Sequence, residues 1–188
     1  GLDVAAPVVV LLATQEPQPR QQEHGEFVRQ QVGQEQQPER RWRYFSDQVM
    51  GGLSQGQANF VKTDARFSAH LSGWVTTQNN GGFIQIRREI NGSNYPDAKG
   101  VTLKVKGNGE RYYLHLRTKQ TRLPWHYYQA SFDSSSDWQS FSIPFSSFER
   151  SGWVLGAEID PASISSLGIV AYGKDHQADL WIDEIGFY

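Results

Sequence analysis

Residues 101–117 read VTLKVKGNGERYYLHLR and contain two runs in which apolar and polar side chains alternate. The apolar positions are Val101, Leu103, Val105, Tyr112, Leu114 and Leu116. A period of two is that of a β-strand with one buried face. Gly107-Asn108-Gly109 separates the runs with residues that tolerate positive φ, so the stretch predicts a β-hairpin.

The same period continues over most of the chain after Trp42. Alternating runs are centred on residues 65–71, 84–86, 128–132, 141–143, 167–171 and 180–187. Turn-forming Gly, Asn, Ser or Pro stands between most of them, and no long amphipathic helix is visible. We therefore expect an all-β sandwich of roughly nine strands.

Length and composition agree with this class and exclude others. The 188 residues suffice for one sizeable core, and the 6 Trp, 8 Tyr, 10 Phe and 18 Gly favour short strands and tight turns. The formal charge of -2 offers no field that would collect nucleic acid. With 0 Cys, disulfide scaffolds, zinc ribbons and iron–sulfur clusters are excluded. The absence of Cys favours the cytoplasm or an organelle matrix without determining the compartment.

Residues 1–41 differ in composition from the rest. The apolar stretch Val4–Ala13 is too short for a transmembrane helix and is interrupted by Pro7. It is either the end of a targeting sequence or an extended entry segment. Residues 15–40 are rich in Gln, Glu, Pro and Arg and cannot bury enough apolar surface to fold alone. We expect residues 1–41 to be a flexible Gln/Glu/Pro-rich tail or linker and residues 42–188 to be one folded domain.

The alternation of inward and outward side chains along each strand, here called strand parity, predicts a recognition face. If the apolar positions of three runs point inward, their polar neighbours share the outward face of a sheet, provided that the strands lie side by side. The candidate ligand- or partner-binding residues are Arg87, Tyr113, His115, Arg117, Tyr127 and Gln129. Guanidinium and amide groups bind hydroxyls or carboxylates, and tyrosine rings pack beside them. An ordinary solvated face would show the same pattern.

Patterns typical of catalysis or metal binding do not fit their context. Gly52-Leu53-Ser54-Gln55-Gly56 matches G-x-S-x-G but lacks the strand before it and the helix after it. The five His show no zinc-binding spacing, and no phosphate loop occurs. Asp179, Asp183 and Glu184 form a weak candidate for calcium, although strand ends that carry charge for solubility are the better explanation. We expect no catalytic residue, no metal and no cofactor.

An ordered series of motifs resembles the complex I intermediate-associated protein family. The series consists of FSDQVMGGLS (45–54), NNGGF (79–83), YYLHLRT (112–118), YQA (128–130), WQ (138–139) and IPF (143–145). The resemblance covers about residues 42–188 and leaves the tail outside. It implies a galactose-binding-like jelly roll, similar to carbohydrate-binding modules, and no established reaction. Its mitochondrial members assist assembly of respiratory NADH dehydrogenase.

The motif loop has two interpretations. Its candidate residues are Asp47, Met50, Gly51, Gly52, Ser54, Asn80, Gly81 and Gly82. Asp47 is expected to hold backbone N–H groups across a glycine turn, which would make the loop a structural clasp. The same loop could also form the rim of a binding face. Arg87, Arg117 and Gln129 match the family's pattern as well as the parity argument.

Three functions remain open. The first is a non-enzymatic, chaperone-like assembly factor that binds a protein, such as a respiratory-complex subunit or intermediate, through a rim that exposes Trp74, Trp125 or Trp153. The second is a carbohydrate-binding module that holds a glycan on a concave sheet face. The third is an enzyme in which Arg117 holds an anion and His115 transfers a proton. Neither nucleic acid nor a transmembrane segment enters these hypotheses.

Overall fold

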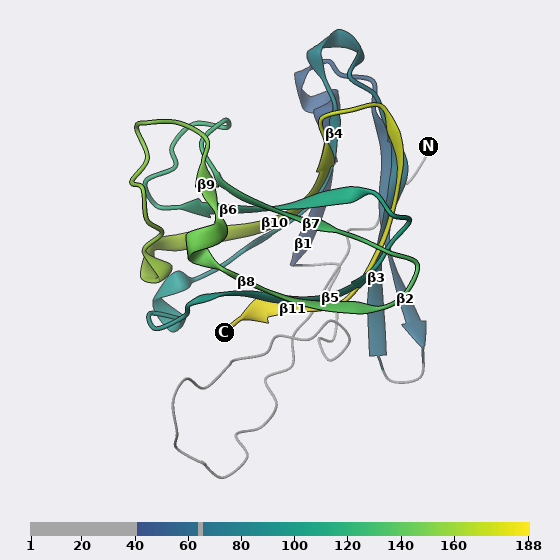
Figure 1. Cartoon of the computed structure of the whole chain (residues 1–188). Coiled ribbons are helices and arrows are strands. Elements are labelled where there is room, and N and C mark those ends of the chain that lie inside the picture. The colour runs from purple at the N-terminus through teal and green to yellow at the C-terminus, as the bar shows by residue number, and fades with distance from the viewer. Residues whose placement is uncertain (1–40, 64–65) are drawn as a thin grey trace.

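The computed structural model describes residues 41–63 and 66–188, which fold into two antiparallel β-sheets packed face to face (Figure 1). In order across the sheet, the six-stranded sheet contains β1 (Trp42–Ser46), β4 (Phe83–Glu89), β10 (Ile164–Tyr172), β6 (Arg111–Thr118), β7 (Tyr128–Asp133) and β9 (Glu149–Arg150). The five-stranded sheet contains β2 (Gln55–Thr63), β3 (Arg66–Val75), β11 (His176–Phe187), β5 (Gly100–Lys106) and β8 (Gln139–Pro144). The predicted all-β sandwich is confirmed.

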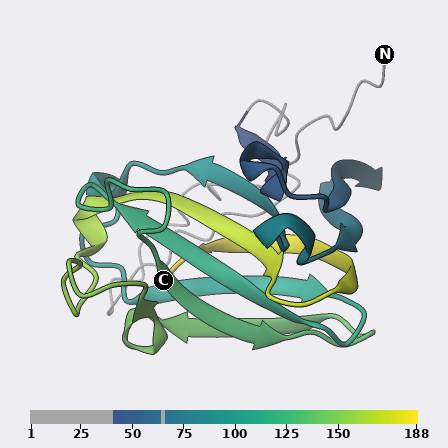
Figure 2. The same ribbon diagram turned by 90° about the horizontal axis from the view of Figure 1, so that it is seen from above.

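Short 3₁₀ helices connect the strands. They are η2 (Asp47–Met50), η3 (Gln78–Asn80), η4 (Gly92–Asn94), η5 (Phe145–Ser147) and η6 (Pro161–Ser163). Over the described ranges these single turns are the only helices, and a membrane-spanning helix is not found among them. Viewed from above, the strands of the two layers cross the molecule one over the other (Figure 2).

The core lies between the two sheets and follows the predicted parity. Ile84 and Ile86 of β4 and Leu114 and Leu116 of β6 are fully buried, and apolar side chains of β3, β5 and β11 face them from the other layer. Their polar neighbours are therefore directed to the opposite side of the six-stranded sheet. Figure 1 shows β4 and β9, toward opposite ends of this sheet, rising on the same side of β6, β7 and β10.

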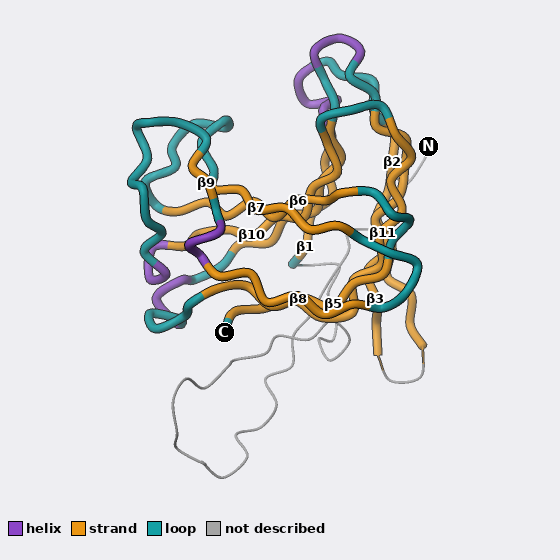
Figure 3. Tube along the Cα trace, in the orientation of Figure 1, coloured by secondary structure: helices purple, strands orange, loops and turns teal. Residues whose placement is uncertain are grey.

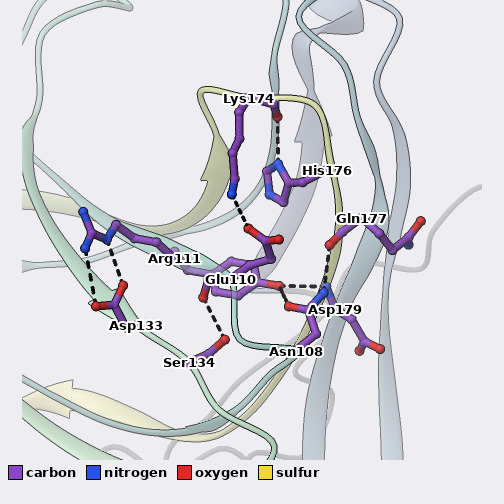
Figure 4. Close-up of polar contacts among 10 residues, drawn as sticks. Asn108, Glu110, Arg111, Asp133, Ser134, Lys174, His176, Gln177 and Asp179 are labelled. Carbon is purple, nitrogen blue, oxygen red and sulfur yellow. Dashed lines mark hydrogen bonds and ion pairs between the residues drawn. The ribbon is translucent and has the colours of Figure 1, made fainter.

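The predicted hairpin at Gly107–Gly109 is wrong. β5 pairs with β11 and β8, whereas β6 pairs with β10 and β7, so this turn carries the chain from one sheet to the other. Asn108 fixes the crossing, because its Nδ2 donates to the carbonyl of Gln177 at 2.8 Å and its Oδ1 accepts from Tyr112 Oη at 2.7 Å (Figure 4). Alternation fixes which face of each strand is buried, but both sheets of a sandwich satisfy that pattern.

The strand count also differs from the expected value. Eleven strands occur in the described ranges instead of roughly nine, and β1, β2 and β9 were not among the predicted runs. β9 has only two residues, which is too short to show a period. β1 begins at Trp42, where we placed the start of the domain. The predicted tail lies outside the described residues, apart from Arg41.

Candidate binding face

A row of paired residues crosses the outward face of the six-stranded sheet. From β1 to β9 it contains Arg43, Arg87, Gly168, His115, Gln129 and Glu149, each opposite the next. We call it the central row. The structure therefore brings Arg87, His115 and Gln129 onto one face, with β10 inserted between the strands of Arg87 and His115. Because Gly168 has no side chain, the Gln85 amide can lie over the middle of the row.

His115 contacts two neighbouring side chains of the face. Its Nε2 donates to Gln129 Oε1 at 2.8 Å, and its ring stacks on Tyr127 with centroids 4.1 Å apart. Burial lowers the pKa of His115 to about 4, and the charges of Arg87 and Arg117 act in the same direction. His115 is thus a neutral imidazole at physiological pH, with Nε2 already donating.

Arg117 is directed at the chain itself. Its guanidinium donates to the carbonyls of Leu123 at 2.7 Å and Pro124 at 2.9 Å. These bonds tie the loop between β6 and β7 to the sheet. The structure therefore gives Arg117 a positioning role beside the face and leaves fewer of its N–H groups for a ligand.

Arg87 lies at the other end of the central row, next to an open pocket of about 250 Å³. Arg43, Phe45, Arg87 and Glu89 line this pocket. The Arg87 guanidinium lies 4.6 Å from the centre of the Phe45 ring, and Nη2 donates to Gln85 Oε1 at 3.2 Å. Burial lowers the pKa of Arg87 to about 10, followed by the charges of Arg117 and Arg43, so the group stays protonated at neutral pH.

The face around Tyr113 also contains residues that were not among the predicted binding residues. The Tyr172 ring lies 4.5 Å from Tyr113 and 5.9 Å from His115, and the Gln85 side chain lies against Gly168. Gln85 has the predicted outward parity but is only 3% exposed because Arg87 and β10 cover it. Tyr172 and Gly168 were missed because β10 is buried on both faces and shows no alternation.

The motif loop is a clasp built on Asp47, which is 0% exposed. One carboxylate oxygen accepts the backbone N–H of Ser54 at 3.0 Å. The other accepts the Ser54 hydroxyl and the backbone N–H groups of Gly82 and Phe83. Two loops far apart in the sequence are thereby joined through one buried charge.

The glycines of the clasp are required for two different reasons. Gly51 adopts φ 85°, which favours glycine, and Asn80 also has a positive φ of 57°. At Gly52 and Gly81 a Cβ would overlap the Asp47 carboxylate, so the requirement is close approach. Gly52 itself does not adopt a positive φ.

Ser54 cannot serve as an exposed nucleophile. It is fully buried, its hydroxyl donates to Asp47, and its Oγ accepts the Thr76 N–H at 3.0 Å. Met50 is exposed, together with Val49 and Leu53, whereas Asp47 and Ser54 of the same loop are buried. Figure 3 shows the short helices that lie in the connecting loops in purple.

A second exposed apolar cluster borders the face near β9. It consists of Leu123 and Trp125 from the loop after β6, and Trp153 and Val154 from the loop after β9; we call it the aromatic rim. Trp125 is 63% exposed and Trp153 is 89% exposed. Ser151 joins the two loops, because its Oγ donates to the Trp125 carbonyl at 2.6 Å and accepts the Tyr127 N–H at 3.0 Å. Trp74, the other tryptophan expected at a rim, is exposed on β3 of the five-stranded sheet.

The weak calcium candidate is dispersed by the fold. Asp179 contacts His70 Nε2 at 2.6 Å, and Asp183 lies 3.7 Å from Lys104 Nζ. Within residues 41–63 and 66–188, no three His, Cys, Asp or Glu side chains come together as a metal-binding group.

The sequence pattern of complex I intermediate-associated protein 30 matches residues 30–182, which is most of the chain. The chain belongs to the complex I intermediate-associated protein 30 family. The match begins at residue 30 and so includes the end of the segment that we expected to lie outside the family pattern. No curated protein sequence matches the chain significantly.

The solved structures similar to this family member include carbohydrate-binding modules. One is the family 11 module of a cellulosomal cellulase from Clostridium thermocellum, with 17% identity, a TM-score of 0.62 and coverage of 78% of this chain and 86% of that one. The same module in complex with a β-1,3-1,4-mixed-linked tetrasaccharide has the same identity and TM-score and is covered over 88% of its length. A family 30 module from a second cellulosomal cellulase of C. thermocellum is 15% identical, with a TM-score of 0.51 and coverage of 70% and 81%. These likenesses establish the jelly-roll fold.

Proposed function

We propose that this chain is a non-catalytic, chaperone-like binding domain that holds a protein subunit while respiratory complex I is assembled. Membership of the complex I intermediate-associated protein 30 family supports this role. The observation that carries it is the aromatic rim, whose two tryptophans are largely exposed although their loops are fixed to each other and to the sheet. Exposed aromatic side chains carried by fixed loops beside a polar face are typical of protein-binding hot spots.

The polar groups that could support chemistry are already engaged. The His115 Nε2 proton is bonded to Gln129, Ser54 is buried on Asp47, and Arg117 holds loop carbonyls. A general acid or base needs an accessible proton site with a pKa near the working pH. These contacts favour binding over catalysis.

Affinity capture from a detergent-solubilised membrane lysate of the source organism tests the proposal. The full chain is compared with the double variant Trp125→Ala/Trp153→Ala, and Trp74→Ala on the other sheet is the matched control. We expect complex I subunits with the wild type and with Trp74→Ala, and a loss of about tenfold or more with the double variant. Equal recovery with the double variant would show that the rim does not bind the partner, and absence of complex I subunits from the wild-type capture would contradict the function.

Glycan binding is a second candidate, favoured by the stack of His115 on Tyr127 beside the Gln129 amide. An aromatic platform with an adjacent hydrogen-bonding side chain suits a sugar ring. Calorimetry with the β-1,3-1,4-mixed-linked tetrasaccharide tests this candidate. Saturable binding that is lost in Tyr127→Ala and retained in Trp74→Ala would support a carbohydrate-binding module; no heat of binding would count against it.

A further inference from the structure

The pocket at the β1–β4 end of the face combines two arginines with a carboxylate that engages only one of them. Arg43 and Arg87 are directly opposite each other on neighbouring strands, where like charges repel. Glu89 Oε1 lies 3.4 Å from Arg43 Nη2, and both side chains are mostly exposed, 85% and 77%. Such an exposed pair is weak and easily rearranged.

Arg87 has no carboxylate partner among the residues that the structure describes. Within the same part of the chain, its only side-chain hydrogen bond is to the neutral Gln85 amide, and the Phe45 ring covers one face of the guanidinium. Gly168, its partner in the central row, contributes no side chain that could neutralise it. A half-buried cation is thus held in place, with donor capacity remaining on the pocket side.

The pocket dimensions indicate what it can accept. About 250 Å³ lies below the range of pockets that enclose whole small-molecule ligands, so the space suits one group of a larger ligand. The four lining side chains carry two positive charges and one negative charge. One additional anion would balance them. A planar carboxylate can accept two parallel N–H bonds from a guanidinium fork.

We propose that Arg87, which lies over the Phe45 ring, and Arg43 form a binding site for a carboxylate, supplied by an Asp or Glu side chain of the protein partner. This inference rests on the proposed function for the source of the carboxylate, whereas the site itself is independent of it. The acidic side chain anchors a partner segment at one end of the central row, opposite the aromatic rim near β9. Partners would then be selected by an acidic residue at one end and apolar residues at the other.

A titration of the ¹⁵N-labelled full chain with sodium acetate, at ionic strength held constant with sodium chloride, tests the site. We expect a saturable NMR shift of the Arg87 side-chain Nε–H and the Phe45 amide, with affinity about tenfold lower in Arg87→Gln. Arg43→Gln, a change at an exposed position, should also weaken binding, and Arg111→Gln should leave it unchanged. A non-saturable shift, an unchanged affinity in Arg87→Gln, or saturation by inorganic phosphate but not by acetate would overturn the carboxylate site.

Affinity capture with Arg87→Gln tests the source of the carboxylate. Reduced recovery of complex I subunits, with folding retained, supports an acidic partner residue. Full recovery together with acetate binding by the wild type overturns the partner assignment and leaves the site. Saturation by glucuronate more tightly than by acetate would assign the site to an acidic sugar instead. If the wild type captures no complex I subunit, the proposed function fails while the acetate titration still decides whether the site exists.

Discussion

The buried carboxylate of Asp47 accepts the backbone N–H of Gly82, which lies 35 residues further along the chain. The bond joins the turn after β1 to the turn before β4. Both glycine-containing loops therefore contact the same carboxylate. Because this charge is fully buried and bonded to four donors, its removal leaves unsatisfied N–H groups in the interior.

We expect Asp47→Asn to lower the free energy of unfolding by about 2 to 4 kcal/mol, since an amide cannot accept all these bonds and places its own N–H₂ against donors. Chemical denaturation measures the loss. Asp97→Asn, at an exposed carboxylate, is the matched control and should leave the free energy of unfolding unchanged. A stable Asp47→Asn protein would show that the clasp does not depend on charge.

Gly52→Ala should destabilise the fold by about 2 kcal/mol or more, because the new Cβ overlaps the Asp47 carboxylate. Gly152→Ala is the control, since a Cβ there meets nothing within 4 Å. Thermal unfolding of the two variants side by side measures the difference. Equal melting temperatures would contradict the close approach between Gly52 and Asp47.

Arg117→Gln should loosen the loop after β6 without unfolding the sandwich. Two carbonyl bonds are lost, and amides of residues 119–127 should exchange hydrogen faster, by about tenfold. Arg111 lies on the same strand as Arg117 and makes an exposed contact with Asp133 of β7, so Arg111→Gln should leave exchange in that loop unchanged. Unchanged protection in Arg117→Gln would show that other contacts hold the loop.

His115 should make the free energy of unfolding decrease as the solution is acidified. Burial lowers its pKa from 6.5 to about 4 in the folded state, so between these values the unfolded chain binds a proton that the folded chain does not. The free energy of unfolding therefore falls as pH is lowered from 6.5 toward 4, and His115 contributes no pH dependence above that window. His115→Gln should reduce this decrease by about 1 to 3 kcal/mol.

The His115 titration can be followed directly by the imidazole NMR signal. A midpoint well below 6 is expected. A midpoint near 6.5 would mean that the ring is solvated and that the stack with Tyr127 is not kept in solution.

The sequence predicted the strands whose two faces differ in burial. Ile84, Ile86, Leu114 and Leu116 alternate with polar residues, and their parity correctly placed Arg87 and His115 on the outward side. It did not predict which strands are neighbours, because alternation carries no information about pairing partners. The crossing between sheets at Gly107–Gly109 and the position of β10 between β4 and β6 are therefore known only from the structure.

Parity also could not show which side chains are already engaged. Arg87 and Arg117 look equivalent in the sequence, yet one lies beside an open pocket and the other holds the carbonyls of Leu123 and Pro124. Asp47 was recognised through its glycine-rich motif, and the expected backbone bonds are present. The hydrogen bond from the Thr76 N–H to Ser54 Oγ joins two segments that are far apart in the sequence, so residue spacing could not predict it.

Complementation of a deletion strain tests the central claim most directly. The gene is removed from the source organism, and mature complex I is measured by native gel electrophoresis with NADH dehydrogenase staining. We predict loss of the mature complex and accumulation of subcomplexes, restored by the wild type and by Trp74→Ala but not by Trp125→Ala/Trp153→Ala at equal protein levels. Normal amounts of mature complex I in the deletion strain would contradict the account.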